Sequence, residues 1–168
     1  AVIAGNVLQK SFAGENPAFI IFAAEGAPHP DNALVVANNT FWNARYKATG
    51  VRNRSTAGAV VTNNIFAGAP VLALDGPGIL TTNLRRAETG LKDPRGLDFS
   101  LLPASAAIDA GTELASVDPR LPVPLLEYVH PLAGRERLGV WTPDLGAYEF
   151  CGELRGRDPP LALRDPED

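Results

Sequence analysis

The stretch LVVANNTF at Leu34–Phe41 aligns without a gap with AVVTNNIF at Ala59–Phe66. The same frame fits AVIAGNVL at Ala1–Leu8 and GILTTNLR at Gly78–Arg85. Each stretch is a short run of mostly apolar residues of β type, followed by an Asn and then by another apolar residue. An internal repeat of this kind constrains the architecture before any single residue is interpreted, and it predicts a β-solenoid.

The Asn of each frame defines one column, whose members are Asn6, Asn39, Asn64 and Asn83. At a tight turn, Asn tolerates left-handed backbone angles and forms local hydrogen bonds. Stacked between coils, its amide can also donate to and accept from the Asn above and below. The alternative is that Asn only marks exposed turns. The same position in all the apolar frames favours a ladder of hydrogen bonds.

A third strand is expected in each coil, between the aligned frames. The candidates are AFIIF at Ala18–Phe22, GVRNRS at Gly50–Ser55 and PVLAL at Pro70–Leu74. A coil of three strands and their turns needs about 20 residues, so the longer intervals between frames carry loop insertions. β-Branched residues dominate the columns, as parallel strands prefer, and stacked coils place Phe41 and Phe66 together in the core.

Arg85 ends the column that holds Phe41 and Phe66, so we expect the last coil at this point. The chain then divides into the last coils of a parallel β-helix at 1–95, a capping segment packed on the helix at 96–150, and a disordered tail at 151–168. The ladder is already running at Asn6. We therefore expect the chain to be the C-terminal part of a longer protein, with further coils before it.

The composition is that of a globular protein of 168 residues with a formal net charge of -4, which argues against a nucleic-acid binder. No apolar run approaches the roughly 20 residues that span a membrane. The single Cys, Cys151, excludes an internal disulfide, and we expect it to be packed or partly exposed rather than a nucleophile. His29 and His130 lack metal-ligand spacing, so no metal or cofactor is expected.

Two later motifs carry a resemblance. They are DFSLLPASAAIDAG at Asp98–Gly111 and DLGAYE at Asp144–Glu149. Together with the coils, they resemble the C-terminal part of right-handed parallel β-helix proteins of the pectate-lyase-like superfamily, in particular those with a choice-of-anchor Q type segment. The family patterns are close to D-[FY]-x-L-x-x-x-S-P-A-I-D-A-G and D-x-G-A-Y-E, and Ala106 stands where the family usually has Pro. The resemblance implies an all-β fold and a secreted or surface-attached bacterial protein, which we expect to be a monomer.

Enzymes of this superfamily mostly act on acidic polysaccharides, through charged residues on the outer face of one strand column. Arg52 and Arg54 share one strand face and could hold a uronate carboxylate bidentately. The simpler interpretation, two solvent-facing cations, is favoured. Trp42 lies one step out of phase with the core residue Phe41, so it is a candidate surface aromatic for a sugar.

Asp109 and Asp144 each precede a glycine, Gly111 and Gly146, by two residues. An Asp at this position usually caps the amides of a turn. We interpret both acids as structural rather than as calcium or catalytic ligands. An acid pair could hydrolyse a glycoside if its carboxyl groups lay about 5–9 Å apart.

The sequence is compatible with three functions. The favoured one is a noncatalytic extracellular β-helix segment, structural or carbohydrate-contacting, of a larger secreted or surface protein. The alternative is the C-terminal part of a polysaccharide lyase or glycoside hydrolase whose active site lies mostly upstream; a weaker one is an adhesive surface like that of autotransporters. The residues identify no catalytic group and leave open whether the protein is an enzyme. A groove lined by three or more convergent ionisable residues would favour the enzyme.

Overall fold

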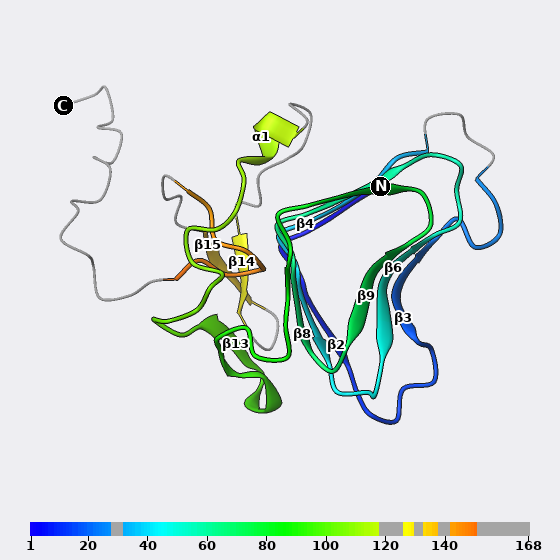
Figure 1. Cartoon of the computed structure of the whole chain (residues 1–168). Helices are drawn as coiled ribbons and strands as arrows, with labels where there is room; N and C mark the ends of the chain where they lie inside the picture. Colours follow the sequence, from blue (N-terminus) through cyan, green and yellow to red (C-terminus); the bar gives the residue numbers. More distant parts are fainter. Residues whose placement is uncertain (28–31, 118–125, 130–132, 138–141, 151–168) are drawn as a thin grey trace, which may run out of the picture.

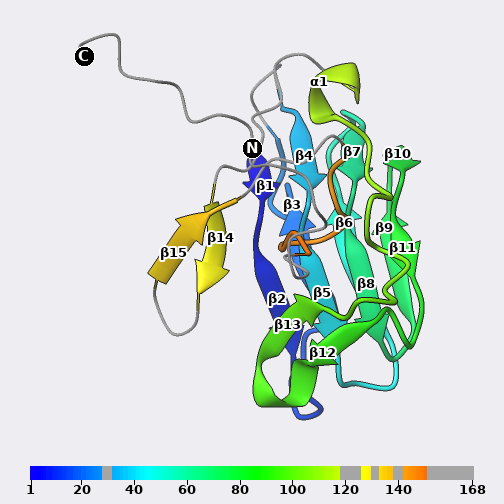
Figure 2. The same ribbon diagram turned by 90° about the vertical axis from the view of Figure 1, so that its left-hand side faces the viewer.

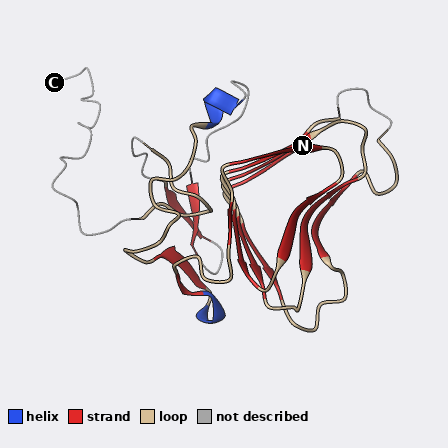
Figure 3. Ribbon diagram, in the orientation of Figure 1, coloured by secondary structure: helices blue, strands red, loops and turns tan. Residues whose placement is uncertain are grey.

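The computed structural model describes residues 1–27, 32–117, 126–129, 133–137 and 142–150. Almost all of its regular structure is β-strand (Figure 3). The chain passes in turn through three parallel sheets, which enclose a common interior when the stack is viewed along its axis (Figure 1). The predicted parallel β-helix is therefore confirmed. Cys151, His29, His130 and the tail 151–168 lie outside the described residues.

The three sheets take one strand each from successive coils. The first sheet contains β1 (Val2–Ala4), β4 (Leu34–Ala37), β7 (Ala59–Thr62) and β10 (Gly78–Thr81). The second contains β2 (Val7–Lys10), β5 (Thr40–Asn43), β8 (Ile65–Gly68) and β11 (Leu84–Arg85). The third contains β3 (Ala18–Phe22), β6 (Ala48–Asn53) and β9 (Val71–Asp75).

The strands pair in the register that the repeat predicts. Val35 lies opposite Val2 on one side and Val60 on the other. Phe41 lies opposite Leu8 and Phe66, and the rings of Phe41 and Phe66 stack with their centroids 4.7 Å apart. Both rings are buried in the interior, with residues of all three sheets. Stacking puts like side chains above one another, so a column of the sequence becomes one stripe of the core.

The left-handed residue of each Asn turn is the one before the ladder Asn. Gly5, Asn38, Asn63 and Thr82 have φ angles of 70°, 51°, 54° and 54°. The expectation that the ladder Asn itself takes this conformation is wrong. In each turn, the residue before the ladder Asn takes the left-handed backbone angle that reverses the chain. The ladder Asn itself can then direct its side-chain amide along the stack.

The C-terminal part packs against the side of the stack (Figures 1 and 2). The described residues of this part form two antiparallel hairpins and two short helices. These are β12 (Leu91–Asp93) with β13 (Asp98–Leu101), β14 (Leu126–Val129) with β15 (Ala133–Glu136), the 3-10 helix η1 (Pro94–Gly96) and α1 (Leu114–Val117).

The outer faces of the first two sheets explain why the C-terminal part packs there. Ile65 and Ala67 of β8 are buried outside the stack, in a second apolar cluster with Phe99 and Leu101 of β13. Leu114 of α1 packs on the outer face of the first sheet. Both faces of these sheets are thus apolar, as in parallel sheets that are covered on both sides.

Candidate functional site

The Asn column forms a continuous hydrogen-bonded ladder inside the turn. The main-chain N–H of each Asn donates to Oδ1 of the next, over 2.9 Å from Asn6 to Asn39, 2.9 Å from Asn39 to Asn64 and 2.9 Å from Asn64 to Asn83. Nδ2 donates to the same oxygen over 3.1, 3.0 and 2.9 Å. The side chains of Asn39 and Asn64 are fully buried. This arrangement joins the coils and leaves the inner amides no access to a ligand.

The residues before the ladder hold the C-terminal part in place. Nδ2 of Asn63 donates to the carbonyl oxygen of Thr112 at 2.6 Å, and its Oδ1 accepts from the N–H of Thr112 at 2.9 Å. Nδ2 of Asn38 donates to the carbonyl oxygen of Asp144 at 3.3 Å. The two adjacent asparagines of a turn therefore have different partners. The ladder Asn binds the neighbouring coil, and the Asn before it binds the C-terminal part.

Arg52 and Arg54 both interact with Asp75, which the sequence analysis did not identify. Nε of Arg52 donates to Oδ2 of Asp75 at 2.9 Å, and Nη2 of Arg54 reaches the same oxygen at 3.4 Å. Strand pairing puts Asp75 of β9 directly opposite Arg52 of β6. Asp75 was missed because the strand was expected to end one residue earlier, although the register already placed it in the Arg52 column.

The Arg52–Arg54–Asp75 cluster carries one net positive charge. Its side chains are 27%, 50% and 34% exposed, respectively, so the ion pairs themselves contribute no more than about 1 kcal/mol each. A guanidinium group has five N–H donors. Each Arg makes one of these interactions with Asp75, so donors remain for a carboxylate on the outer face of the third sheet.

Trp42 does not join this cluster, because it belongs to the second sheet. Its ring is half-buried and meets Phe99 edge-on, with the centroids 6.5 Å apart. It also lines a hollow of about 370 Å³ between β5 and the segment around Leu91. The structure thus separates the predicted aromatic contact from the predicted arginines.

Asp144 caps two amides, one in each direction along the chain. Its Oδ1 accepts from the N–H of Asp109 at 2.7 Å, and its Oδ2 accepts from the N–H of Phe150 at 2.5 Å. Burial raises the pKa of Asp144 above its ordinary value, while these two N–H donors act in the opposite direction. The side chain of Asp109 is exposed, and its backbone is left-handed with a φ of 52°.

The two glycines after these acids sit where no side chain fits. A Cβ on Gly146 would lie 2.6 Å from Oγ1 of Thr40 and 2.7 Å from Cδ1 of Ile65, and a Cβ on Gly111 would lie 2.5 Å from the carbonyl oxygen of Pro143. The N–H of Ala147 donates to Oγ1 of Thr40 at 3.0 Å. The DLGAYE motif therefore packs in direct contact with the strands of the stack.

A buried ion pair, between Arg137 and Glu149, stabilises the DLGAYE motif. Nη2 of Arg137 lies 2.5 Å from Oε1 of Glu149, and the two side chains are only 4% and 5% exposed. Arg137 also donates to the carbonyl oxygens of Gly146 and Asp144. Burial raises the pKa of Glu149, and the Arg137 guanidinium acts against this shift. These acids are held by internal partners.

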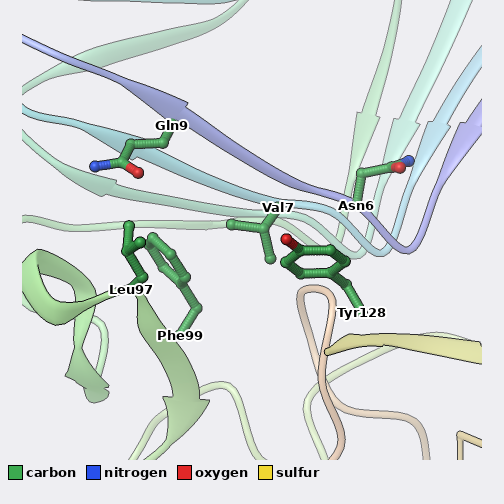
Figure 4. Close-up of a pocket in the computed structure, with 6 residues that line it drawn as sticks. All are labelled: Asn6, Val7, Gln9, Leu97, Phe99 and Tyr128. Atoms are coloured by element: carbon green, nitrogen blue, oxygen red, sulfur yellow. The ribbon is translucent and has the colours of Figure 1, made fainter. Parts of the chain in front are cut away.

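A hollow of about 410 Å³ lies between β2 and the C-terminal part (Figure 4). Its lining is apolar and amide-bearing, with an aromatic hydroxyl: Asn6, Val7, Gln9, Leu97, Phe99 and Tyr128. None of these side chains is charged at neutral pH. Among the described residues that line it, the hollow can receive a neutral group and has no acid–base pair.

Within the described part of the chain, no three His, Cys, Asp or Glu residues gather in a way that could hold a metal ion. No helix found there is long and apolar enough to cross a membrane. The chain matches no protein-family model, no curated protein and no solved structure. The parallel β-helix is established from the strand pairing, and the affiliation to a superfamily stays a resemblance that the two late motifs carry.

Proposed function

We propose that this chain is a noncatalytic, monomeric β-helix segment of a larger extracellular bacterial protein, related to the pectate-lyase-like superfamily with a choice-of-anchor Q type segment. It serves as a rigid support with a carbohydrate-contacting outer face. The observation that carries the proposal is the placement of the ionisable groups. Asp144, Glu149 and Arg137 are hydrogen-bonded within the fold, and the described residues that line the larger hollow are uncharged.

The outer face of the third sheet supports the carbohydrate-contacting part of this function. Arg52, Arg54 and Asp75 are three convergent ionisable residues, the number we expected of an enzyme. However, both arginines pair with Asp75 at the outer face of the third sheet, and the three residues line neither hollow described above. Their net positive charge suits an acidic sugar. The second candidate, the C-terminal part of a polysaccharide lyase or glycoside hydrolase, would use them as contacts beside an active site located in upstream coils.

The test combines binding and cleavage on the same polysaccharides. Polygalacturonate, alginate and a neutral glucan are run with the purified chain in affinity electrophoresis, and new reducing or unsaturated ends are measured after long incubation. We expect weak, salt-sensitive retardation by the acidic polymers and no cleavage. Cleavage of any of them would overturn the noncatalytic function.

Matched variants locate the contact. Arg52→Ala and Arg54→Ala should each reduce retardation by the acidic polymers. Lys92→Ala is the control, because Lys92 is an exposed cation that pairs with Asp98 in the β12–β13 hairpin. An equal loss of retardation in all three variants would show that only the net charge of the protein matters. The outer face of the third sheet would then not be the contact site.

A further inference from the structure

The hollow that Trp42 lines lies on the outer face of the second sheet, and we call it the Trp42 hollow. Its volume of about 370 Å³ is within the range of about 300–1,000 Å³ that is common for small-ligand sites. Trp42 of β5 lies opposite Ala67 of β8, so a large side chain stands beside a small one in the same column. The β12–β13 hairpin packs over this step (Figure 2), and its Leu91 lines the hollow.

The segment 87–91, which lines the hollow, is fixed by hydrogen bonds. The carbonyl oxygen of Thr89 accepts from Oγ of Ser105 at 2.6 Å, and that of Gly90 accepts from the N–H of Leu102 at 2.7 Å. Gly90 has a φ of 76°, and a Cβ there would lie 2.7 Å from Cα of Ser105. The backbone around the hollow is therefore preorganised, which lowers the entropy cost of binding a ligand.

Thr89 supplies a polar group to the lining. The residue is 4% exposed, and its hydroxyl has no hydrogen-bond partner within the described part of the chain. A buried hydroxyl without a partner is uncommon in folded proteins and costs stability. Because Oγ1 and Cγ2 exchange places when χ1 rotates to another staggered well, the hydroxyl can turn to a partner that enters the hollow.

Glu88 gives the hollow a negative charge. It is exposed, and it is the only ionisable residue among the described ones that line the hollow. Apart from Glu88, Thr89 and the half-buried indole of Trp42, the described lining consists of Ala, Gly, Leu and Pro residues. An indole face attracts a cation, and a carboxylate pairs with one. The hollow therefore suits a cation that also has an apolar face and a hydroxyl group.

We propose that the Trp42 hollow binds an amino sugar. The apolar face of the pyranose ring lies on the indole, the ammonium group pairs with Glu88, and a ring hydroxyl bonds Thr89. The inference rests on the carbohydrate-contacting part of the proposed function, but it adds a second site whose ligand has the opposite charge. Trp42 and the Arg52–Arg54–Asp75 cluster belong to different sheets, so each site can be tested alone.

The test is an NMR titration of the ¹⁵N-labelled full chain with glucosamine, glucose, glucuronate and ethanolamine. We expect glucosamine to shift the indole N–H peak of Trp42, which Trp42→Phe identifies, with a Kd on the order of 1 mM. Glucose, which lacks the cation, and ethanolamine, which lacks the ring, should each bind about threefold more weakly. Glucuronate should cause no shift. Equal affinity for glucosamine and either glucose or ethanolamine would overturn the assignment to an amino sugar.

Matched variants locate the ligand. Glu88→Gln should weaken glucosamine binding about threefold, because an exposed ion pair is lost. Glu113→Gln is the control, since it removes another exposed carboxylate, next to α1 on the first sheet. Equal weakening in both variants would show that the cation follows only the net charge of the protein, and it would overturn the site.

Thr89→Val tests the hydroxyl. It should weaken glucosamine binding without lowering the midpoint of thermal unfolding, because the hydroxyl has no partner to lose within the described part of the chain. Unchanged binding would overturn the assignment of this side chain. Retardation by polygalacturonate together with an absent glucosamine shift would overturn this inference alone. A Trp42 shift without such retardation would support it and contradict the acidic-sugar contact of the third sheet.

Discussion

The main-chain N–H of Asp109 donates to Oδ1 of Asp144 at 2.7 Å, which joins two segments that lie 35 residues apart. Asp109 stands near the end of the first late motif, and Asp144 begins the second. The N–H of Leu145 reinforces the junction by donating to the carbonyl oxygen of Ala107 at 2.9 Å. The two motifs therefore form one structural unit, and their resemblance to a family pattern has a physical basis in this contact.

Replacing Asp144→Ala should destabilise the protein by about 2 kcal/mol, because the partly buried N–H groups of Asp109 and Phe150 both lose their acceptor. Urea unfolding followed by circular dichroism measures the change. Asp109→Asn is the control, since it keeps the main-chain donor and a residue type that tolerates the left-handed angle. Equal losses in the two variants would contradict the capping role of Asp144.

The position of an Asn in the ladder should decide how much it contributes. Asn64→Ala takes away the acceptor of the buried N–H of Asn39 and the Nδ2 donor to the carbonyl oxygens of Val36 and Thr62, so we expect a loss of about 3 kcal/mol. Asn6→Ala, at the exposed end, should cost about 1 kcal/mol. Chemical denaturation of both variants makes the comparison, and a larger loss at Asn6 would exclude a ladder that is stabilised by burial.

Gly50 packs against the ring of Phe66, and a Cβ there would lie 2.5 Å from Cε1 of that ring and 2.8 Å from the carbonyl oxygen of Ala73. Gly50→Ala should therefore cost about 2 kcal/mol by overpacking the core. Gly58→Ala is the matched control, because the nearest atom to its Cβ would be 3.6 Å away. Thermal unfolding should separate the two variants, and an unchanged midpoint for Gly50→Ala would contradict the ring position.

The hydroxyl of Ser100 donates to Asp98 and is the main reason that the pKa of Asp98 is lowered; the ion pair with Lys92 at 3.0 Å adds to the effect. A carboxyl whose pKa is lowered by folding stabilises the protein above its unfolded pKa, and this stability is lost as the pH falls through the folded pKa. Ser100→Ala should raise the pKa of Asp98 in a carboxyl NMR titration. Its stability deficit should shrink over the same acidic window.

Ser116→Ala serves as the control for that titration, since Ser116 donates to the carbonyl oxygen of Glu113 and not to Asp98. An Asp98 pKa that stays in place in Ser100→Ala would show that the hydroxyl does not hold the carboxylate.

The repeat allowed the core register to be predicted because stacked coils keep like residues in contact. Phe41 and Phe66 could be assigned to one stripe from their alignment alone. The same alignment misled at the turn, where the left-handed residue is Asn63 and not Asn64. Two adjacent asparagines look equivalent in a sequence, and only the direction of each amide distinguishes the roles.

The partners outside the repeat could not be predicted. Arg137 and Glu149 form a buried pair, and Glu127 accepts from the N–H of Glu149 at 2.6 Å. No period relates these positions, and their pairing depends on how the β14–β15 hairpin lies against the segment 142–150. Asp75 could have been predicted in part. Had the expected strand Pro70–Leu74 been one residue longer, the register would have placed Asp75 opposite Arg52.

The hydrogen bond from Ala147 to Thr40 has a consequence for the order of folding. The two residues are 107 positions apart, whereas neighbouring ladder residues are separated by 33, 25 and 19. Closing short loops costs less entropy than closing long ones. The coils can therefore stack as the chain leaves the ribosome, and the outer apolar cluster around Ile65 stays incomplete until residue 147 has been made. During synthesis this interval is the time when the half-finished protein is most exposed to aggregation.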